Sequence, residues 1–196
     1  MSSDKRDLIV VDVETTGLDV NRHWALEVAA VNVTTGEELY FVPALPTGAL
    51  DQAEGKAMKI NGYFTREVYA HRLTTDTAWP YWLKLWDWLK GNTLGGSNPT
   101  FDAAMLNRAM EFNHGCLPTG YGKPEVPPFT PAPWHHRLAD LSAYAAGALN
   151  IDPTALPGLN VVCRSLHVEN ESEHSALGDA RATAECFRRL ADKAAD

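Results

Sequence analysis

The chain has little of what marks membrane and secreted proteins. No apolar run among its 196 residues approaches the length that crosses a bilayer, and its polar first residues lack the apolar core of a signal peptide. The three cysteines, Cys116, Cys163 and Cys186, are odd in number and lack a metal-ligand spacing. They fit buried thiols in a reducing compartment. We therefore expect a cytoplasmic protein with no membrane partner.

Positive charge is also scarce. Lys and Arg number 17 against 25 Asp and Glu, which gives a formal net charge of −8. A protein that coats nucleic acid neutralises many phosphates with Lys and Arg, so this balance argues against that class. It is compatible with a nuclease that grips only a strand end, because bound divalent ions reverse the sign of the local field. For such an enzyme we expect weak, salt-sensitive binding and low processivity.

The length and the ordinary apolar content predict one domain over residues 1–196. Residues 115–134 contain so many prolines and glycines that no regular element is expected there. A loop of this length is often functional. We interpret this segment as a loop insertion, which is either a surface excursion, a lid or a feature that binds a partner.

The first part of the chain predicts three strands joined by short turns. Residues 8–11 are a continuous apolar run, and residues 25–33 are rich in strand formers. The sequence Thr34-Thr35-Gly36-Glu37 is typical of a hairpin turn, and a further strand follows over residues 38–42. These three strands predict an antiparallel meander at the front of a sheet.

Helices and two more strands are predicted after this meander. Helical spacing of Trp79, Trp82, Leu85, Trp86 and Leu89 indicates a helix over residues 77–91, capped by Thr77. We expect this stripe to face the core rather than to stack on bases, with Trp88 off the stripe and exposed. The remaining predicted elements are helices at 51–60, from 102, at 141–149, 157–166 and 175–194, and strands at 93–97 and 134–140.

Two carboxylates follow the first apolar run. Side chains at positions i and i+2 of a strand face the same way, so Asp12 and Glu14 are expected to project together. Paired carboxylates repel each other, and a hard cation such as Mg²⁺ or Mn²⁺ between them relieves the repulsion. Thr15-Thr16-Gly17 then supplies hydroxyls, backbone N–H groups and a residue that turns tightly.

The string Asp-x-Glu-Thr-Thr-Gly resembles the first motif of the DEDD 3′→5′ exonucleases. Two further stretches resemble the other motifs of this superfamily. Asn98-Pro99-Thr100-Phe101-Asp102 is similar to the second motif, with Ser97 where the family often has His. The stretch from His174 to Ala180 resembles the third motif of the DEDDh, or DnaQ-like, subfamily. Its aspartate is Asp179. The three motifs occur in the family's order along nearly the whole chain.

The resemblance implies an α/β, RNase H-like fold: a central mixed five-stranded sheet, its first three strands antiparallel, with helices on both faces. It also implies two divalent metal ions, Mg²⁺ or Mn²⁺, as cofactors. By this resemblance, Asp12 bridges the two ions, Glu14 and Asp179 complete the site that activates water, and Asp102 supports the second ion. His174 acts as the general base.

The resemblance further implies a pocket for the 3′-terminal nucleotide. Asn61 lies in a segment similar to the family's Ile-His-Gly-Ile, at the position where His is usual, although a role as a helix cap is an equal alternative. Asn98 either contacts the substrate or holds the second motif. The predicted substrate-binding residues are Thr15, Thr16, Leu18, Asn61, Asn98 and Phe101.

These patterns predict a metal-dependent 3′→5′ exonuclease that releases nucleoside 5′-monophosphates from the 3′ end of nucleic acid, with single-stranded DNA as the first candidate substrate. RNA is the alternative, since exoribonucleases of the RNase T and oligoribonuclease types share the motifs. A non-catalytic polymerase-accessory domain is a third interpretation. A DNA polymerase or another replication protein is the candidate partner.

Overall fold

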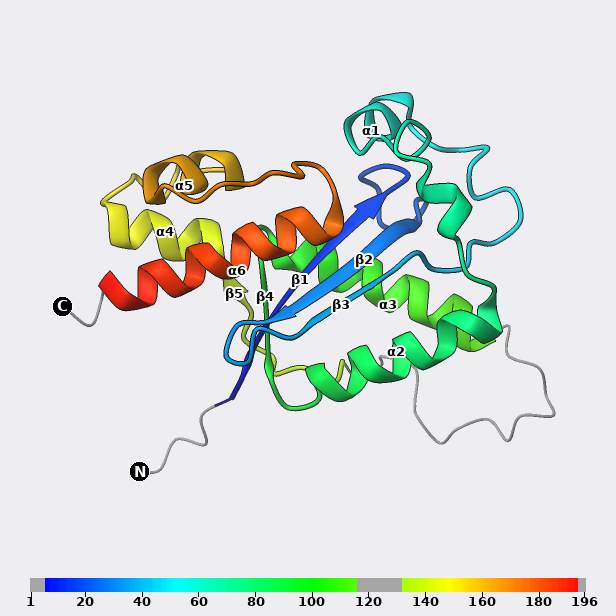
Figure 1. Ribbon diagram of the computed structural model, residues 1–196, viewed down its shortest axis with the longest axis horizontal. Coiled ribbons are helices and arrows are strands. Elements are labelled where there is room, and N and C mark those ends of the chain that lie inside the picture. The colour runs from blue at the N-terminus through cyan, green and yellow to red at the C-terminus, as the bar shows by residue number, and fades with distance from the viewer. Residues whose placement is uncertain (1–5, 116–131, 194–196) are drawn as a thin grey trace.

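Five strands form one mixed sheet in the computed structural model, which describes residues 6–115 and 132–193. Their order across the sheet is β3-β2-β1-β4-β5 (Figure 1). β2 pairs antiparallel with β1 and β3, whereas β4 runs parallel to β1 and β5. The strands are β1 (Leu8–Thr15), β2 (Ala25–Asn32), β3 (Glu38–Phe41), β4 (Thr93–Gly96) and β5 (Ala139–Asp140).

Helices cover both faces of the sheet (Figure 1). α2 and α3 pack on one face, and α4, α5 and α6 pack on the other. This arrangement confirms the predicted mixed five-stranded sheet with three antiparallel strands and helices on both sides. The helices are α1 (Gly55–Ile60), the short 3-10 helix η1 (Val68–His71), α2 (Thr75–Leu89), α3 (Pro99–Gly115), α4 (Leu141–Leu149), α5 (Leu159–Leu166) and α6 (Ala176–Lys193).

β1 lies in the middle of the sheet, and its side chains alternate between the two faces. Ile9, Val11 and Val13 belong to the core against α2 and α3. Val10 belongs to the core against α4, α5 and α6. By the same alternation, the acidic residues at the end of β1 continue the face covered by α6.

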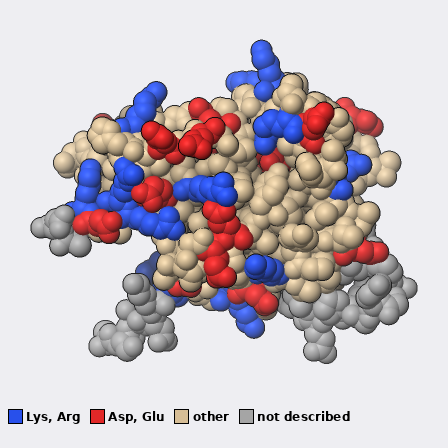
Figure 2. Space-filling view, viewed as in Figure 1, with Lys and Arg blue, Asp and Glu red and all other residues tan. Residues whose placement is uncertain are grey.

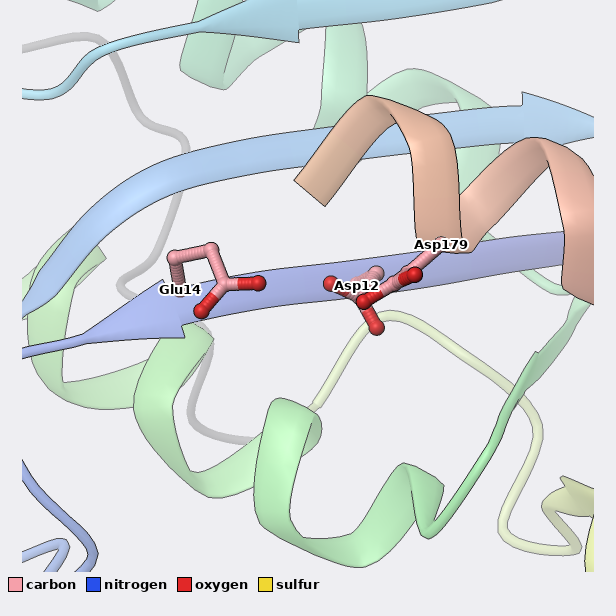
Figure 3. Close-up of side chains that lie close together, drawn as sticks. All are labelled: Asp12, Glu14 and Asp179. Atoms are coloured by element: carbon pink, nitrogen blue, oxygen red, sulfur yellow. The ribbon is translucent and has the colours of Figure 1, made fainter. Parts of the chain in front are cut away.

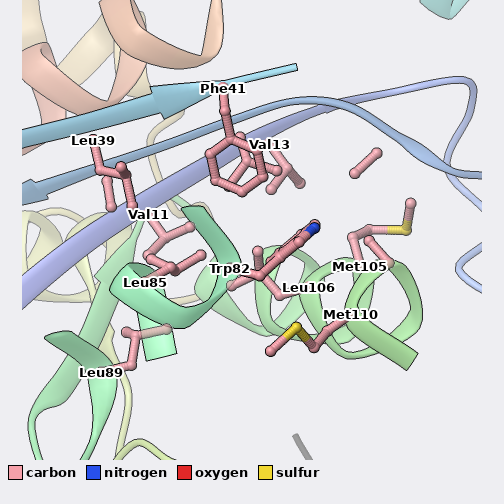
Figure 4. Packing of buried hydrophobic residues seen from close by; sticks show 14 of the residues in the cluster. Val11, Val13, Leu39, Phe41, Trp82, Leu85, Leu89, Met105, Leu106 and Met110 are labelled. Atoms are coloured by element: carbon pink, nitrogen blue, oxygen red, sulfur yellow. The ribbon is translucent and has the colours of Figure 1, made fainter. Parts of the chain in front are cut away.

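The core on the α2 face is built around Trp82, which is fully buried (Figure 4). Its ring meets Phe41 of β3 edge to face, with 4.8 Å between ring centroids. Trp82 belongs to the predicted stripe, whose other members are buried except for the partly buried Trp86. Trp88 was expected to be exposed, but it is partly buried against this core, with Lys84 Nζ 5.1 Å from its ring centroid.

Three elements differ clearly in their bounds from those expected. α2 begins at Thr75 rather than at residue 77, because Thr74 is the N-cap and forms reciprocal hydrogen bonds with Thr77. The strand expected over residues 134–140 is reduced to β5, because the chain bends where the Arg137 N–H donates to His135 Nδ1. The helix expected at 51–60 is regular only from Gly55.

The predicted buried thiols are confirmed for Cys163 and Cys186, which are free and have their sulfur atoms 3.7 Å apart. Cys116 and most of the loop expected at 115–134 lie outside the described residues, so the burial of this thiol and the loop stay predictions. Within residues 6–115 and 132–193, none of the helices has both the length and the apolar character that crossing a membrane requires.

The different surroundings of two tryptophans on α2 give a stability test. Replacing the fully buried Trp82 by Ala is expected to lower the free energy of unfolding by about 3–5 kcal/mol, because it removes the centre of a packed core. Trp88→Ala is the matched control and is expected to cost about 1 kcal/mol. Urea denaturation measures both, and equal losses would contradict this description of the core.

Candidate active site

Three carboxylates from two elements meet at the end of β1 (Figure 3). Asp12 and Glu14 project from β1, and Asp179 projects from the first turn of α6. Each residue offers an oxygen, and these oxygens lie within 4.8 Å of one another. The pairing of β1 with β2 shifts by one residue between Glu14 and Thr15, which marks a bulge directly at this group. We call these three residues the carboxylate group.

Asp179 is held by two hydrogen bonds. The side-chain amide of Asn170 donates to its Oδ1 at 2.6 Å, and the backbone N–H of His174 donates to its Oδ2 at 3.3 Å. The segment that provides both donors packs tightly on α6, since a Cβ on Gly178 would lie 2.3 Å from the Ser172 carbonyl oxygen. The third motif therefore positions its aspartate through a loop that only glycine at residue 178 admits.

Asp102 lies beside the carboxylate group but does not belong to it. It is buried in the first turn of α3, and its Oδ1 accepts a hydrogen bond of 3.0 Å from the backbone N–H of Val13. Pro99 begins α3, as proline often does at a first helical position. Asp102 thus faces the β1 backbone between Asp12 and Glu14.

His174 contacts the carboxylate group through its backbone N–H, which donates to Asp179, and not through its imidazole ring. Its side chain is 49% exposed, and Nε2 lies 3.6 Å from Glu173 Oε1. Its φ of 63° is in the left-handed region, which a non-glycine residue adopts at some cost. The imidazole therefore lies at the rim of the site, next to solvent.

The acidic side chains raise one another's proton affinity. Burial, together with the charges of Asp102 and Asp179, holds the pKa of Asp12 well above its ordinary 3.8. Burial and the charge of Asp179 raise the pKa of Glu14 to about 8.

Burial also dominates at the remaining two aspartates. It raises the pKa of Asp102 to about 7, although the bond from Val13 acts in the opposite direction. It raises the pKa of Asp179 as well. Side chains that repel one another this strongly, and that offer only oxygen, fit a divalent cation such as Mg²⁺ or Mn²⁺.

An ion pair between a buried glutamate and a more exposed arginine lies next to the group and was not expected from the sequence. Glu27 of β2 pairs directly across from Glu14 and is 1% exposed. Its carboxylate forms an ion pair with Arg66 and accepts a 2.8 Å hydrogen bond from the Tyr40 hydroxyl. Arg66 Nε also donates to the Asn61 carbonyl at 2.8 Å. A single charged residue within the apolar stretch from Ala25 to Val31 was the available signal.

A cavity of about 280 Å³ opens beside the carboxylate group. It lies between the end of β1, α1 and the start of α3, and Leu18, 75% exposed, stands at its edge. Lys56 of α1 is a cation on its wall that the sequence analysis did not single out. Glu14 and four of the six predicted substrate-binding residues line this cavity: Thr15, Leu18, Asn61 and Phe101.

The other two predicted substrate-binding residues lie elsewhere. The Thr16 hydroxyl is buried, is hydrogen-bonded with His23 Nδ1 at 3.2 Å and accepts from the Trp24 N–H. Asn98 is exposed before α3, with a φ of 71°. Asn61 lines the cavity, yet its side-chain atoms are engaged, since its amide donates to the Thr15 carbonyl and its oxygen accepts from the Tyr63 N–H.

The raised pKa of Glu14 predicts how metal-free protein responds to pH. Between its ordinary pKa of 4.5 and about 8, the folded protein keeps a proton that the unfolded chain has lost. The unfolded chain then binds fewer protons, so the free energy of unfolding falls as pH rises through this window. Thermal unfolding in EDTA is expected to show a melting temperature that decreases toward pH 8, and excess Mg²⁺ is expected to oppose the decrease.

Asp12→Asn tests the cause, because it removes one charge from the group and keeps the shape of the side chain. It is expected to raise the melting temperature in EDTA at pH 8. Asp87→Asn, at an exposed position of α2, is the matched control and is expected to leave it unchanged. A metal-free melting temperature that rises with pH in the wild type would contradict the assigned pKa direction.

Two helical glycines test how Asp179 is held. Gly178→Ala is expected to displace residues 172–175 and to weaken Mn²⁺ binding, measured by isothermal titration, because its Cβ meets a backbone oxygen. Gly147→Ala, in α4, meets nothing within 4 Å and is expected to stabilise the protein by about 0.5–1 kcal/mol. Unchanged Mn²⁺ affinity in Gly178→Ala would show that the loop does not position Asp179.

Comparison with known proteins identifies the family. The RNase_T model, described as exonuclease, matches residues 9–187 of this chain. None of the curated protein sequences compared with the chain matches it.

Several solved structures share the fold. E. coli Exonuclease I in complex with a dT13 oligonucleotide has 18% identity and a TM-score of 0.68 over 96% of this chain. The zinc-bound form of the E. coli ExoI–ssDNA complex has 18% identity and a TM-score of 0.65 over 97% of this chain. A moderately thermophilic Exonuclease I from Methylocaldum szegediense has 18% identity and a TM-score of 0.61 over 96% of this chain.

The chain spans 41% of the length of each of these solved chains, so the likeness concerns one part of them. At this identity it shows a shared fold. The family model is more specific, because it extends from β1 through most of α6 and so includes all three motifs. The chain therefore belongs to the RNase_T exonuclease family, among the DnaQ-like DEDD nucleases.

Proposed function

We propose that this protein is a metal-dependent 3′→5′ exonuclease that removes nucleoside 5′-monophosphates from single-stranded DNA. The observation that carries the proposal is the carboxylate group, whose oxygens lie within 4.8 Å of one another at the edge of a cavity of about 280 Å³. A site that joins anionic oxygen ligands to an adjoining cavity suits hydrolysis of a phosphodiester next to a terminal nucleotide.

Asp12, Glu14 and Asp179 would hold one divalent ion, and Asp102 would help to hold a second. When bound, such ions lower the pKa of water and stabilise charge on the entering and leaving oxygens. The raised pKa values of the four carboxyl groups support this assignment, since a cation offsets the repulsion that raises them. Loading with metal would accordingly release protons from Asp12 and Glu14.

The cavity would orient the terminal nucleotide. Leu18 and Phe101 offer apolar surface to its base, and Thr15 and Glu14 line the wall nearest the carboxylate group. Lys56 would face the anionic strand from α1. Asn61 acts on the shape of the wall rather than on the substrate, because its side chain is committed to Thr15 and Tyr63.

His174 would take the proton of the attacking water on its imidazole. Its backbone N–H binds Asp179, which keeps the residue beside the carboxylate group, while the ring lies next to Glu173 and is about half exposed. Rotation of the ring away from Glu173 and toward the cavity would bring a nitrogen to the water. Glu173 can hold the imidazole outside until the substrate arrives.

Single-stranded DNA is favoured as the substrate because structures that share the fold hold DNA. E. coli Exonuclease I is described in complex with dT13 and with dA16 oligonucleotides. RNA is the second candidate substrate, supported by the RNase_T family to which the chain belongs. A purely accessory role is less well supported, since Asp12, Glu14, Asp102, His174 and Asp179 are all retained.

The test is incubation with 5′-labelled single-stranded DNA and RNA of equal sequence, in Mg²⁺ or Mn²⁺. We expect a ladder that shortens from the 3′ end, is faster on DNA, and is abolished by EDTA and by Asp12→Asn. Asp87→Asn is expected to retain full activity. If neither strand is shortened although Mn²⁺ binds, the exonuclease proposal is wrong and the accessory role is favoured. Faster shortening of RNA than of DNA would show that RNA is the preferred substrate.

A further inference from the structure

A second cavity, of about 370 Å³, is lined in part by the loop that also carries Leu18. Its wall comes from the loop between β1 and β2, from residues 46–52 and from the middle of α3. No Asp or Glu is among the described residues that line it, but two arginines and a tryptophan are. We call it the arginine cavity, defined by Arg22, Trp24 and Arg108.

The side chains of this cavity are arranged as in a site for an anion. The Arg108 guanidinium carbon lies 4.0 Å from the Trp24 ring centroid, and an edge contact with Phe112 supports the ring from another side. Stacking fixes the plane of the guanidinium and leaves its N–H groups directed outward. Among the described residues, no hydrogen-bond acceptor is paired with the buried Arg108 Nε. Buried donors in proteins normally have a hydrogen-bond partner, so an unpaired donor on the wall of a cavity favours an acceptor that binds there.

Neither arginine is neutralised by a carboxylate within the described residues. The basic side chains gathered over α6 in Figure 2 differ in this respect. Arg181 pairs there with Glu38, and Arg188 and Arg189 pair with Glu185. In a chain of net charge −8, the arginine cavity is therefore a better candidate for binding phosphate than the more crowded surface of α6.

The arginine cavity is also close to the proposed active site. Leu18 lines the cavity beside the carboxylate group, and Asn21 lines the arginine cavity. They are three positions apart along the chain, which limits their Cα atoms to a separation of about 11 Å. Two further residues that are close in the chain divide in the same way. Glu54 lines the cavity beside the carboxylate group, and Gln52 lines the arginine cavity. A few nucleotides of a single strand cover this distance.

We propose that the arginine cavity binds the phosphate backbone of the substrate strand a few nucleotides upstream of its 3′ end. The inference rests on the proposed exonuclease function and adds to it a second contact with the strand. Arg108 supplies a preorganised donor to a phosphate oxygen, and Arg22 supplies a second charge from the exposed rim. Trp24 offers an aromatic surface beside them.

The test compares two substrates that share their 3′-terminal dinucleotide: the dinucleotide alone and a longer oligonucleotide. The dinucleotide fills only the cavity beside the carboxylate group, whereas the longer strand reaches the arginine cavity. In Arg22→Ala/Arg108→Ala, the KM for the oligonucleotide is expected to rise roughly tenfold with unchanged kcat, while the KM for the dinucleotide stays constant. The salt slope of oligonucleotide binding is expected to fall by about 0.7 for each lost phosphate contact.

Arg164→Ala, at an exposed arginine of α5 outside any described ion pair, is the matched control and is expected to leave both KM values unchanged. The single variant Arg22→Ala, at the rim, keeps the stacked pair intact and tests the site without disturbing packing. An oligonucleotide KM equal to that of the wild type in both variants, or an equal rise for the dinucleotide, would overturn the inference.

Failure of the proposed exonuclease function can be told apart from failure of this inference, because the wild-type protein would then cleave neither substrate. Fluorescence anisotropy of labelled oligonucleotide in EDTA tests the arginine cavity separately in that case. Weaker binding in the double variant than in Arg164→Ala would support the inference, and equal binding would overturn it.

Discussion

The constraint that dominates this structure is the repulsion between carboxylates, which the fold brings together at the end of one buried strand. Asp12, Glu14 and Asp179 share a space in which their oxygens lie within 4.8 Å, with Asp102 and Glu27 close by. These side chains are partly buried and carry like charges, so each charge raises the proton affinity of the others. A fold keeps such an arrangement when a ligand offsets its cost, and a divalent cation is the ligand that oxygen donors suit.

The surrounding elements are arranged to hold these charges. Val13 donates its N–H to Asp102, and Asn170 and the His174 backbone donate to Asp179. Glu27 is compensated by Arg66, which also ties α1 to the sheet through the Asn61 carbonyl. The same contacts that position the acids therefore also fix the wall of the cavity in which a terminal nucleotide would lie.

The sequence predicted those parts of the site that follow from local geometry. The period of a strand places Asp12 and Glu14 on one face of the sheet, and the order of the three motifs pointed to Asp102 and Asp179.

The sequence did not predict that Thr16 turns inward to His23, or that Asn61 binds the Thr15 carbonyl 46 residues away. It also missed the Glu27–Arg66 pair, since such partners are chosen by tertiary contacts. The earlier start of α2 depended on a local competition between Thr74 and Thr77 as the cap.

We propose that the carboxylate group binds divalent cations. The sharpest test is to titrate Mn²⁺ into the wild type and into Asp179→Asn and to follow it by electron paramagnetic resonance. The substitution removes the charge of one ligand, and its side-chain oxygen can still accept the hydrogen bond from Asn170. We expect bound Mn²⁺ in the wild type and markedly weaker binding in the variant. Equal binding in both proteins, or no bound Mn²⁺ in the wild type, would contradict it.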